Sequence, residues 1–307
     1  MAYVSPAQMP RGSRLALANA RWERLGGNVP DLIPAIRLQE QLVKVALDLL
    51  DAVEHGHVPR LSLPPKYIAA KLGRGVPALT AEPIPMPAEV LGPGLVRLCG
   101  ILEAGGAGPA AAHIGTALAE GRIEAGSLLS ASLARDQAAI RQGAEHLGLA
   151  PDLLWLIAEL AAGPYAHALQ QRVLSRPDAS LAAALDQWSA GYCPACGSWP
   201  ALAEIADAGP VMRCSFCAMS WAPPSGRCVY CRTEGPEFHS AKSSQGAGRQ
   251  LDLCDSCGGY LKVAHTGTLS PFPLLAITDL ETAELDVEAM ALGYHRPALA
   301  AAAGGAG

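Results

Sequence analysis

The sequence contains no stretch that resembles an export signal or a membrane anchor. The first eleven residues, Met1 to Arg11, lack the basic segment and apolar run that define a signal peptide. Nowhere does an apolar run approach the roughly 18 to 20 residues that a helix needs to cross a bilayer. We therefore expect a soluble, cytoplasmic protein without membrane insertion.

An excess of positive charge is also missing. The formal net charge is -5 and the isoelectric point is near 5.9, so no overall field draws the chain to nucleic acid or to an anionic membrane. The sequence has no nucleophile elbow, Walker loop or dinucleotide fingerprint. Half of the residues are apolar, which is enough for a sizeable core, and proteins or small ligands are the expected partners.

The alternation typical of β-strands is scarce in residues 1–189, where apolar residues recur at helical spacings. This pattern predicts a helical N-terminal domain. Asp31 is expected to cap one helix, and a second is expected to run continuously from Leu129 to Leu147 and to stop at Gly148. A third should begin at Pro151 and end at Gly163-Pro164. The apolar stripe of the first helix contains Leu32, Ile36, Val43, Leu47 and Leu50.

An irregular segment is expected at about residues 55–87, because seven prolines there prevent a continuous helix. We expect it to lie extended over the helical surface, and a binding loop is the alternative. Near Trp188 the composition changes to Cys, Gly, Ser and Pro, which places a domain boundary there. Thr278 is expected to cap a final helix, and the tail from Ala298 should be frayed.

Eight of the nine cysteines form four Cys-x-x-Cys pairs, which is the pattern of a metal protein rather than of a disulfide framework in a chain without an export signal. The ninth, Cys99, lies in an apolar helical context and is expected to be a buried, inert thiol. The predicted metal ligands are Cys193, Cys196, Cys214 and Cys217, followed by Cys228, Cys231, Cys254 and Cys257.

The spacing favours two successive tetrahedral sites, one in a module at 190–227 and one in a module at 228–307. Between the inner cysteines of the two sets lie 17 and 22 residues, and 10 residues separate the two sets. A crossed arrangement, in which the first and third pairs share one metal, uses the same residues and stays open. Gly197 and Gly258 each follow a ligand, where the chain turns with positive φ.

Four thiolates fill a tetrahedron, so neither site keeps a position for water or substrate. This predicts structural centres in a protein that is not an enzyme, with no catalytic residues. Both zinc and iron accept four tetrahedral thiolates, and the sequence does not choose between them. Whether two chains pair as a homodimer also stays open.

Two other functions use Cys-x-x-Cys pairs. A thiol-disulfide or iron electron-transfer protein is one alternative, although a redox pair is expected at a helix N-terminus rather than in Gly- and Pro-rich loops. A zinc-ribbon nucleic-acid-binding protein is the other. Between residues 190 and 270 six basic residues balance six acidic ones, and each loaded site adds two negative charges, so this region is a poor phosphate ligand.

The cysteine region resembles the FdhE-type formate dehydrogenase accessory proteins. The resemblance continues through Gly163-Pro-Tyr-Ala-His-Ala-Leu-Gln before the cysteines and through Thr278-Asp-Leu to Gly293-Tyr294 after them. The stretches that carry it are Cys193-Pro-Ala-Cys-Gly-Ser-Trp-Pro, Arg213-Cys-Ser-Phe-Cys-Ala-Met-Ser-Trp, Arg227-Cys-Val-Tyr-Cys and Cys254-Asp-Ser-Cys-Gly-Gly-Tyr-Leu-Lys.

This resemblance implies an α+β fold, with a helical N-terminal domain followed by two rubredoxin-like four-cysteine modules that hold iron. It also implies a cytoplasmic maturation factor that binds the catalytic subunit of a formate dehydrogenase. The eight cysteines match position by position, whereas the helical half matches loosely.

Overall fold

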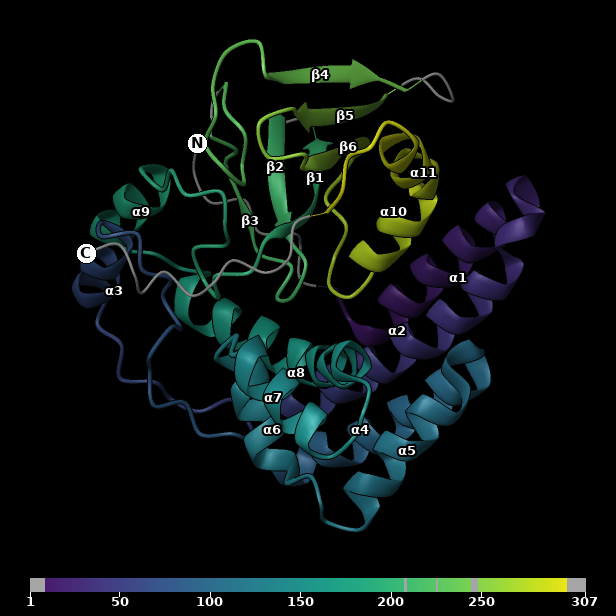
Figure 1. Ribbon diagram of the computed structural model, residues 1–307. Coiled ribbons are helices and arrows are strands. Elements are labelled where there is room, and N and C mark those ends of the chain that lie inside the picture. The colour runs from purple at the N-terminus through teal and green to yellow at the C-terminus, as the bar shows by residue number, and fades with distance from the viewer. Residues whose placement is uncertain (1–8, 207–208, 225, 244–247, 297–307) are drawn as a thin grey trace. The chain divides into compact units, whose positions relative to one another are not determined.

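A computed structural model describes residues 9–206, 209–224, 226–243 and 248–296 (Figure 1). The tail from Ala298, which the sequence predicts to be frayed, lies outside the described residues. The chain forms two compact units. The helical unit contains Met9–Leu61 and Ala81–Arg172, and the cysteine-rich unit contains Ser62–Thr80 and the residues from Val173 onward.

The helical unit is built from α-helices with two short irregular helical turns. α2 buries Ile36, Val43, Leu47 and Leu50, which confirms four of the five residues of the apolar stripe; Leu32, the fifth, is only partly buried in the turn before the helix. Asp31 does not cap this helix, because it lies in a 3-10 turn before Leu32. The elements are α1 (Arg11–Asn28), η1 (Pro30–Leu32), α2 (Ile33–Glu54), α4 (Ala88–Leu102), η2 (Glu103–Ala107), α5 (Gly108–Ala119), α6 (Ala125–Leu133), α7 (Gln137–His146) and α8 (Pro151–Leu174).

Two helix boundaries differ from the expectation. The helix expected from Leu129 to Leu147 is divided into α6 and α7, because Arg135 adopts a positive φ of 62° and Asp136 caps α7 by accepting from the amide of Ala139. The end expected at Gly163-Pro164 was wrong as well. α8 continues through Pro164, since burial of its middle turns, including Tyr165, outweighs the loss of one backbone donor.

One stretch, Ala88–Ala119, is long and apolar enough to cross a membrane by length and composition, which the sequence reading did not anticipate. The core helix of a soluble protein passes the same test. Here the stretch is not one straight helix: Gly106 has a φ of 118° between α4 and α5, and the two helices pack against each other. The segment therefore folds back on itself as a helical hairpin.

The cysteine-rich unit contains one six-stranded sheet with the order β3-β2-β1-β6-β5-β4. All neighbours are antiparallel except β1 and β6, which pair in parallel with Ala203 opposite Val263. The two cysteine modules therefore share one sheet, and the expected α+β class is confirmed. The strands are β1 (Pro200–Ala206), β2 (Gly209–Cys214), β3 (Ser220–Trp221), β4 (Phe238–Lys242), β5 (Arg249–Cys254) and β6 (Tyr260–Gly267).

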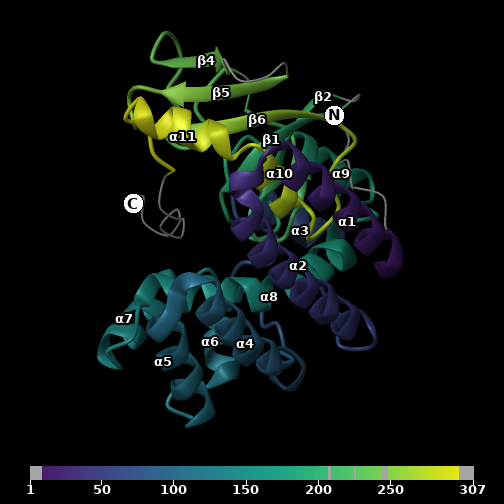
Figure 2. The same cartoon turned by 90° about the vertical axis from the view of Figure 1, so that its right-hand side faces the viewer.

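Among its described residues, this unit also contains the helices α3 (Pro65–Leu72), α9 (Ala179–Asp186), α10 (Leu275–Glu281) and α11 (Ala283–Ala291). Figure 2 shows α11 running alongside β5 and β6, where Leu285 packs against Leu251 and Leu253. Thr278 does not cap the last helix. It lies inside α10, where its hydroxyl bonds to that of Ser270 at 2.6 Å.

A buried ion pair fixes β1 against β2. The carboxylate of Glu204 and the guanidinium of Arg213 are both fully buried and in contact. Arg213 also donates to the carbonyls of Ala218 (3.2 Å) and Ser270 (2.7 Å), and the Ser270 amide donates to Glu204 (3.2 Å). The pair thus joins the sheet to the loop that follows Cys217 and to the segment that leads into α10.

Replacing Arg213 with Met should destabilise the cysteine-rich unit strongly, because Glu204 would be left as a buried charge without its partner. We expect a loss of roughly 3 to 5 kcal/mol, measured by urea denaturation of the metal-loaded protein. Lys242→Met removes the same charge from an exposed position on β4 and should change the free energy of unfolding by less than about 0.5 kcal/mol. Equal effects of the two substitutions would contradict the role of the pair.

Candidate metal centres

Each Cys-x-x-Cys pair forms the same backbone turn, which we call a knuckle. In every knuckle the first cysteine amide donates to the carbonyl five residues later, at 2.8 to 3.0 Å. The amide four residues after that cysteine donates back to its carbonyl, at 2.8 to 3.2 Å. The two bonds close a tight loop that directs both sulfurs to one side. The knuckles begin at Cys193, Cys214, Cys228 and Cys254.

The residue after each second cysteine has a positive φ. For Gly197 (81°) and Gly258 (66°) this confirms the expectation from sequence. Ala218 (54°) and Arg232 (68°) adopt the same conformation without being glycine, and the sequence reading missed them. Residues with a side chain seldom adopt positive φ, because this conformation is sterically unfavourable for them. The two hydrogen bonds of the knuckle therefore impose it on Ala218 and Arg232.

Centre 1 is formed by Cys193, Cys196, Cys214 and Cys217, whose sulfurs all lie within 4.8 Å of one another. The separations Cys193–Cys217, Cys196–Cys214 and Cys196–Cys217 are 3.7, 3.5 and 3.6 Å. Four sulfurs at about 2.3 Å from one ion would be about 3.8 Å apart along a tetrahedron edge. The observed spacing therefore fits one tetrahedral thiolate site.

The surroundings of centre 1 favour a bound cation. All four cysteines are buried, and burial raises the pKa of the Cys193 and Cys217 thiols well above the ordinary value. Four thiolates in this position require a positive ion to offset their charge. Backbone amides add support, because the amides of Ala195 and Phe216 point at Cys193 and Cys214 sulfurs at 3.4 Å.

The proline-rich segment braces centre 1. The amides of Ala78 and Leu79 donate to the carbonyls of Pro194 and Ala195 inside the first knuckle, at 2.8 and 2.9 Å. Lys71 at the end of α3 is buried and donates to the carbonyl of Ala78 at 3.1 Å, which holds this turn in place. Part of the segment expected to be irregular is thus helical, and part of it covers the first knuckle.

Centre 2 is formed by Cys228, Cys231, Cys254 and Cys257, again within 4.8 Å of one another. The sulfurs of Cys228 and Cys257 are 3.8 Å apart, and those of Cys231 and Cys254 are 3.6 Å apart. The cysteines are grouped in the sequential arrangement that the spacing favoured, and not in the crossed one.

The two centres differ in exposure. Cys254 and Cys228 are buried, but Cys231 is exposed and Cys257 is partly exposed. Burial tends to raise the pKa of Cys231, yet hydrogen bonds with Thr233 and with the thiols of Cys254 and Cys257 outweigh it and lower that pKa to about 6. Centre 2 thus offers a sulfur edge to solvent, whereas centre 1 does not. Cys99 lies outside both centres, and burial raises its pKa to about 11, as expected of an inert thiol.

A charged network holds the C-terminal helices next to centre 2, and sequence reasoning did not find it. Lys262 on β6 is fully buried and bonds to Asp279 (2.7 Å) and Asp286 (2.8 Å). Arg296 bonds to the same two carboxylates at 2.8 Å. The opposite charges hold the pKa of Asp279 below its usual range, although burial opposes this. The Tyr-Leu-Lys ending of the cysteine motif thereby connects the sheet to α10 and α11.

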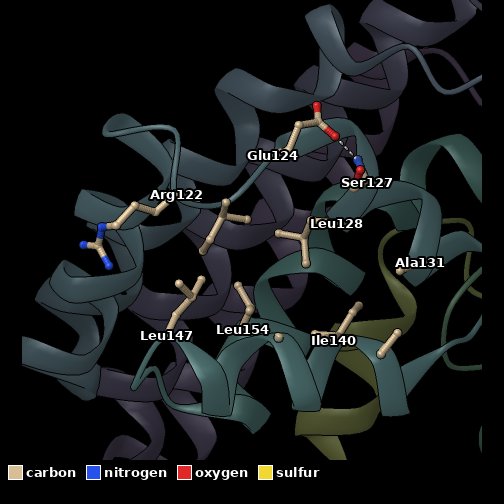
Figure 3. A pocket seen from close by; sticks show the side chains of 11 residues that line it. Arg122, Glu124, Ser127, Leu128, Ala131, Ile140, Leu147 and Leu154 are labelled. Carbon is tan, nitrogen blue, oxygen red and sulfur yellow. Dashed lines mark hydrogen bonds between the residues drawn. The ribbon is translucent and has the colours of Figure 1, made fainter.

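The helical unit contains a separate groove with a volume of about 270 Å³ (Figure 3). Leu128, Ile140 and Leu154 are among its apolar lining residues, and Arg122 and Glu124 lie at its polar side. Glu124 caps α6 by accepting from the amide of Gly126 at 2.9 Å, so its carboxylate already has a structural role. The groove contains no cluster of metal-ligating side chains among the described residues.

Comparison with known proteins places these features in context. FdhE of Escherichia coli is 27% identical over 113 residues, which cover 35% of this chain and 36% of that protein. An FdhE homolog of Aquifex aeolicus is 29% identical over 118 residues, which cover 36% of this chain and 40% of that protein. The matches thus span about two fifths or less of these relatives. No family model matches the chain.

The crystal structure of FdhE from Pseudomonas aeruginosa has a similar fold over nearly the whole chain. The TM-score is 0.56 at 24% sequence identity, and the alignment covers 98% of this chain and 100% of that one. Fold and sites define an α+β protein with helices and a sheet that carries two four-cysteine clusters. The sequence matches in addition make about a third of the chain similar to FdhE proteins.

Gly259→Ala should weaken centre 2 more than centre 1. A Cβ at this position would lie 2.9 Å from the Tyr230 ring and 3.2 Å from the Cys257 sulfur, which is closer than ordinary packing allows. We expect faster loss of one ion per chain to a competing chelator, by about tenfold, with the other ion retained longer. Gly143→Ala, at an exposed helical position with no atom within 4 Å, is the matched control. Identical chelation curves for the two variants would refute this.

Proposed function

We propose that this protein is a cytoplasmic accessory factor that binds the catalytic subunit of a formate dehydrogenase and is needed for its assembly or activity. The similarity of this chain to FdhE proteins, in sequence over about a third of its length and in fold over nearly all of it, is the observation that carries the proposal. The protein would be a binding factor without turnover of its own. Its metal centres would be structural or redox-sensing, and they would keep the cysteine-rich unit rigid enough to recognise an immature partner.

The closed geometry of the centres supports a binding role. Each centre has four sulfur donors in tetrahedral spacing, which leaves no ligand position for an activated water. The cysteine-rich unit also lacks surplus basic charge. Among the described residues, the buried Lys262 is neutralised by Asp279 and Asp286, so it is not available to bind phosphate.

The partner proposal predicts physical association in the cell. A tagged form of this chain should co-purify with a formate dehydrogenase catalytic subunit, and deletion of the gene should lower formate dehydrogenase activity at least roughly tenfold. Re-expression of the intact chain should restore the activity. Wild-type activity in the deletion strain would contradict the proposed function, whatever the metal content of the protein.

We further propose one ion in each centre, with iron favoured by the family resemblance and zinc as the alternative. Protein purified without oxygen should contain two ions per chain by elemental analysis. Cys214→Ser and Cys254→Ser each remove a ligand that is fully buried and should lower the content by at least one ion. Cys99→Ser removes a buried thiol outside both centres and should leave the content at two. Two ions in all three variants would rule out the proposed ligand sets.

The exposed edge of centre 2 favours a second candidate function, electron transfer by an iron centre. An exposed sulfur edge, as at Cys231, is where such a centre would meet a redox partner. Reversible bleaching of a visible absorption band on reduction, at a potential that matches a physiological donor, would favour this candidate. Zinc in the protein as purified would exclude it.

A further inference from the structure

The loop that begins centre 2 packs directly on the chain that enters centre 1. Gly191 is buried two residues before Cys193, and a Cβ built on it would fall 1.7 Å from the carbonyl oxygen of Val229. Val229 lies between the ligands Cys228 and Cys231 and is itself buried. Only glycine permits this backbone contact, which places the chain that leads into the first knuckle against the third knuckle without a side chain between them.

Two aromatic rings form a second contact between the centres. The rings of Trp199 and Tyr230 meet edge to face, with centroids 5.3 Å apart. Trp199 follows the first knuckle, and its carbonyl accepts from the amide of Ser215 in the second knuckle at 3.2 Å. The rings of Tyr192 and Trp199 are also in contact, at 6.0 Å. Trp199 is therefore tied to both halves of centre 1.

Tyr230 is tied to both halves of centre 2 in the same way. Its amide points at the Cys228 sulfur at 3.4 Å within the third knuckle. Its ring lies against Gly259, the residue whose carbonyl closes the fourth knuckle, and its hydroxyl donates to the carbonyl of Tyr260 at 3.1 Å. The Trp199–Tyr230 pair thus connects all four knuckles. A shift of the third knuckle must move the surface on which the first one rests.

We propose that the two centres are energetically coupled through the contacts Gly191–Val229 and Trp199–Tyr230, so that loss of the ion from exposed centre 2 weakens ion binding at buried centre 1. Tyr230 is then a positioning residue for ligands that it does not itself supply. Because Cys231 is exposed and centre 1 is enclosed, centre 2 is the centre through which chelators, oxidants or a partner protein act on both.

The inference rests on the proposed metal loading of the two centres but not on the proposed partner.

The test of the coupling uses the full chain, freed of metal and reloaded with cobalt(II), whose four-thiolate complexes absorb in the visible and near ultraviolet. The binding affinity of each centre is measured by titration against a competing chelator. Cys231→Ser disables centre 2, and Cys217→Ser disables centre 1. Coupling predicts that each substitution lowers the affinity of the other, intact centre by about tenfold, and by the same factor in both directions.

Tyr230→Leu tests the route of the coupling, since it keeps all eight cysteines and removes the ring. We expect two bound cobalt ions and the normal four-thiolate spectrum, but with the influence of Cys231→Ser on centre 1 reduced to less than about twofold. Tyr230→Phe keeps the ring and loses only the hydroxyl, so it should retain the coupling. If Tyr230→Leu fails to fold, the comparison of Cys231→Ser with Cys217→Ser still decides whether coupling exists.

The outcomes separate this inference from the proposals on which it stands. A wild-type chain that binds no cobalt overturns the metal centres themselves. Two ions bound with unchanged affinity at centre 1 in Cys231→Ser overturn the coupling and leave the centres intact. A lowered affinity in one direction only would contradict a reciprocal coupling between the two centres.

Discussion

The gathering of eight sulfurs into two tetrahedral groups is the constraint on which the cysteine-rich unit depends. Each knuckle is closed by two backbone hydrogen bonds, and its ligands sit where strands end or begin, as Cys214 and Cys254 do at the ends of β2 and β5. An ion that holds two knuckles together therefore fixes the strands as well. Because β1 and β6 pair in parallel, the two centres brace a single sheet.

The rest of this unit relies on charge as much as on apolar burial. Arg213 and Glu204 are fully buried as a pair, and Lys262 is buried between Asp279 and Asp286. Breaking such pairs is costly because a charge remains without compensation, so they enforce one arrangement of the helices on the sheet.

The two four-cysteine clusters could be predicted from the sequence, because a Cys-x-x-Cys pair places both of its sulfurs close to one point. The spacing favoured the observed grouping, with Cys193 beside Cys217 and Cys228 beside Cys257, but left the crossed arrangement open. The conformation of Ala218 and Arg232 did not follow, because their residue types do not favour positive φ and the knuckle alone imposes it. The ion pairs of Lys262 with Asp279 and Asp286 could not be predicted either, because these residues are distant in the sequence and meet only in the folded chain.

Helix boundaries were predicted less well, since tertiary packing outweighs local preference. Pro164 did not end α8, because the helix around it is buried. The positive φ of Arg135 divided α6 from α7, although the helical spacing of apolar residues continues across this position. Thr278 was expected as a cap but is buried inside α10, bonded to Ser270. The helical class was nevertheless clear, because Ile36, Val43 and Leu47 needed only the right spacing to reach the core.

X-ray absorption at the metal edge of the anaerobically purified protein tests the central claim most directly. The account predicts that both ions see four sulfur neighbours at about 2.3 Å and no nitrogen or oxygen ligand. Mixed ligation, or fewer than four sulfurs per ion, would contradict it.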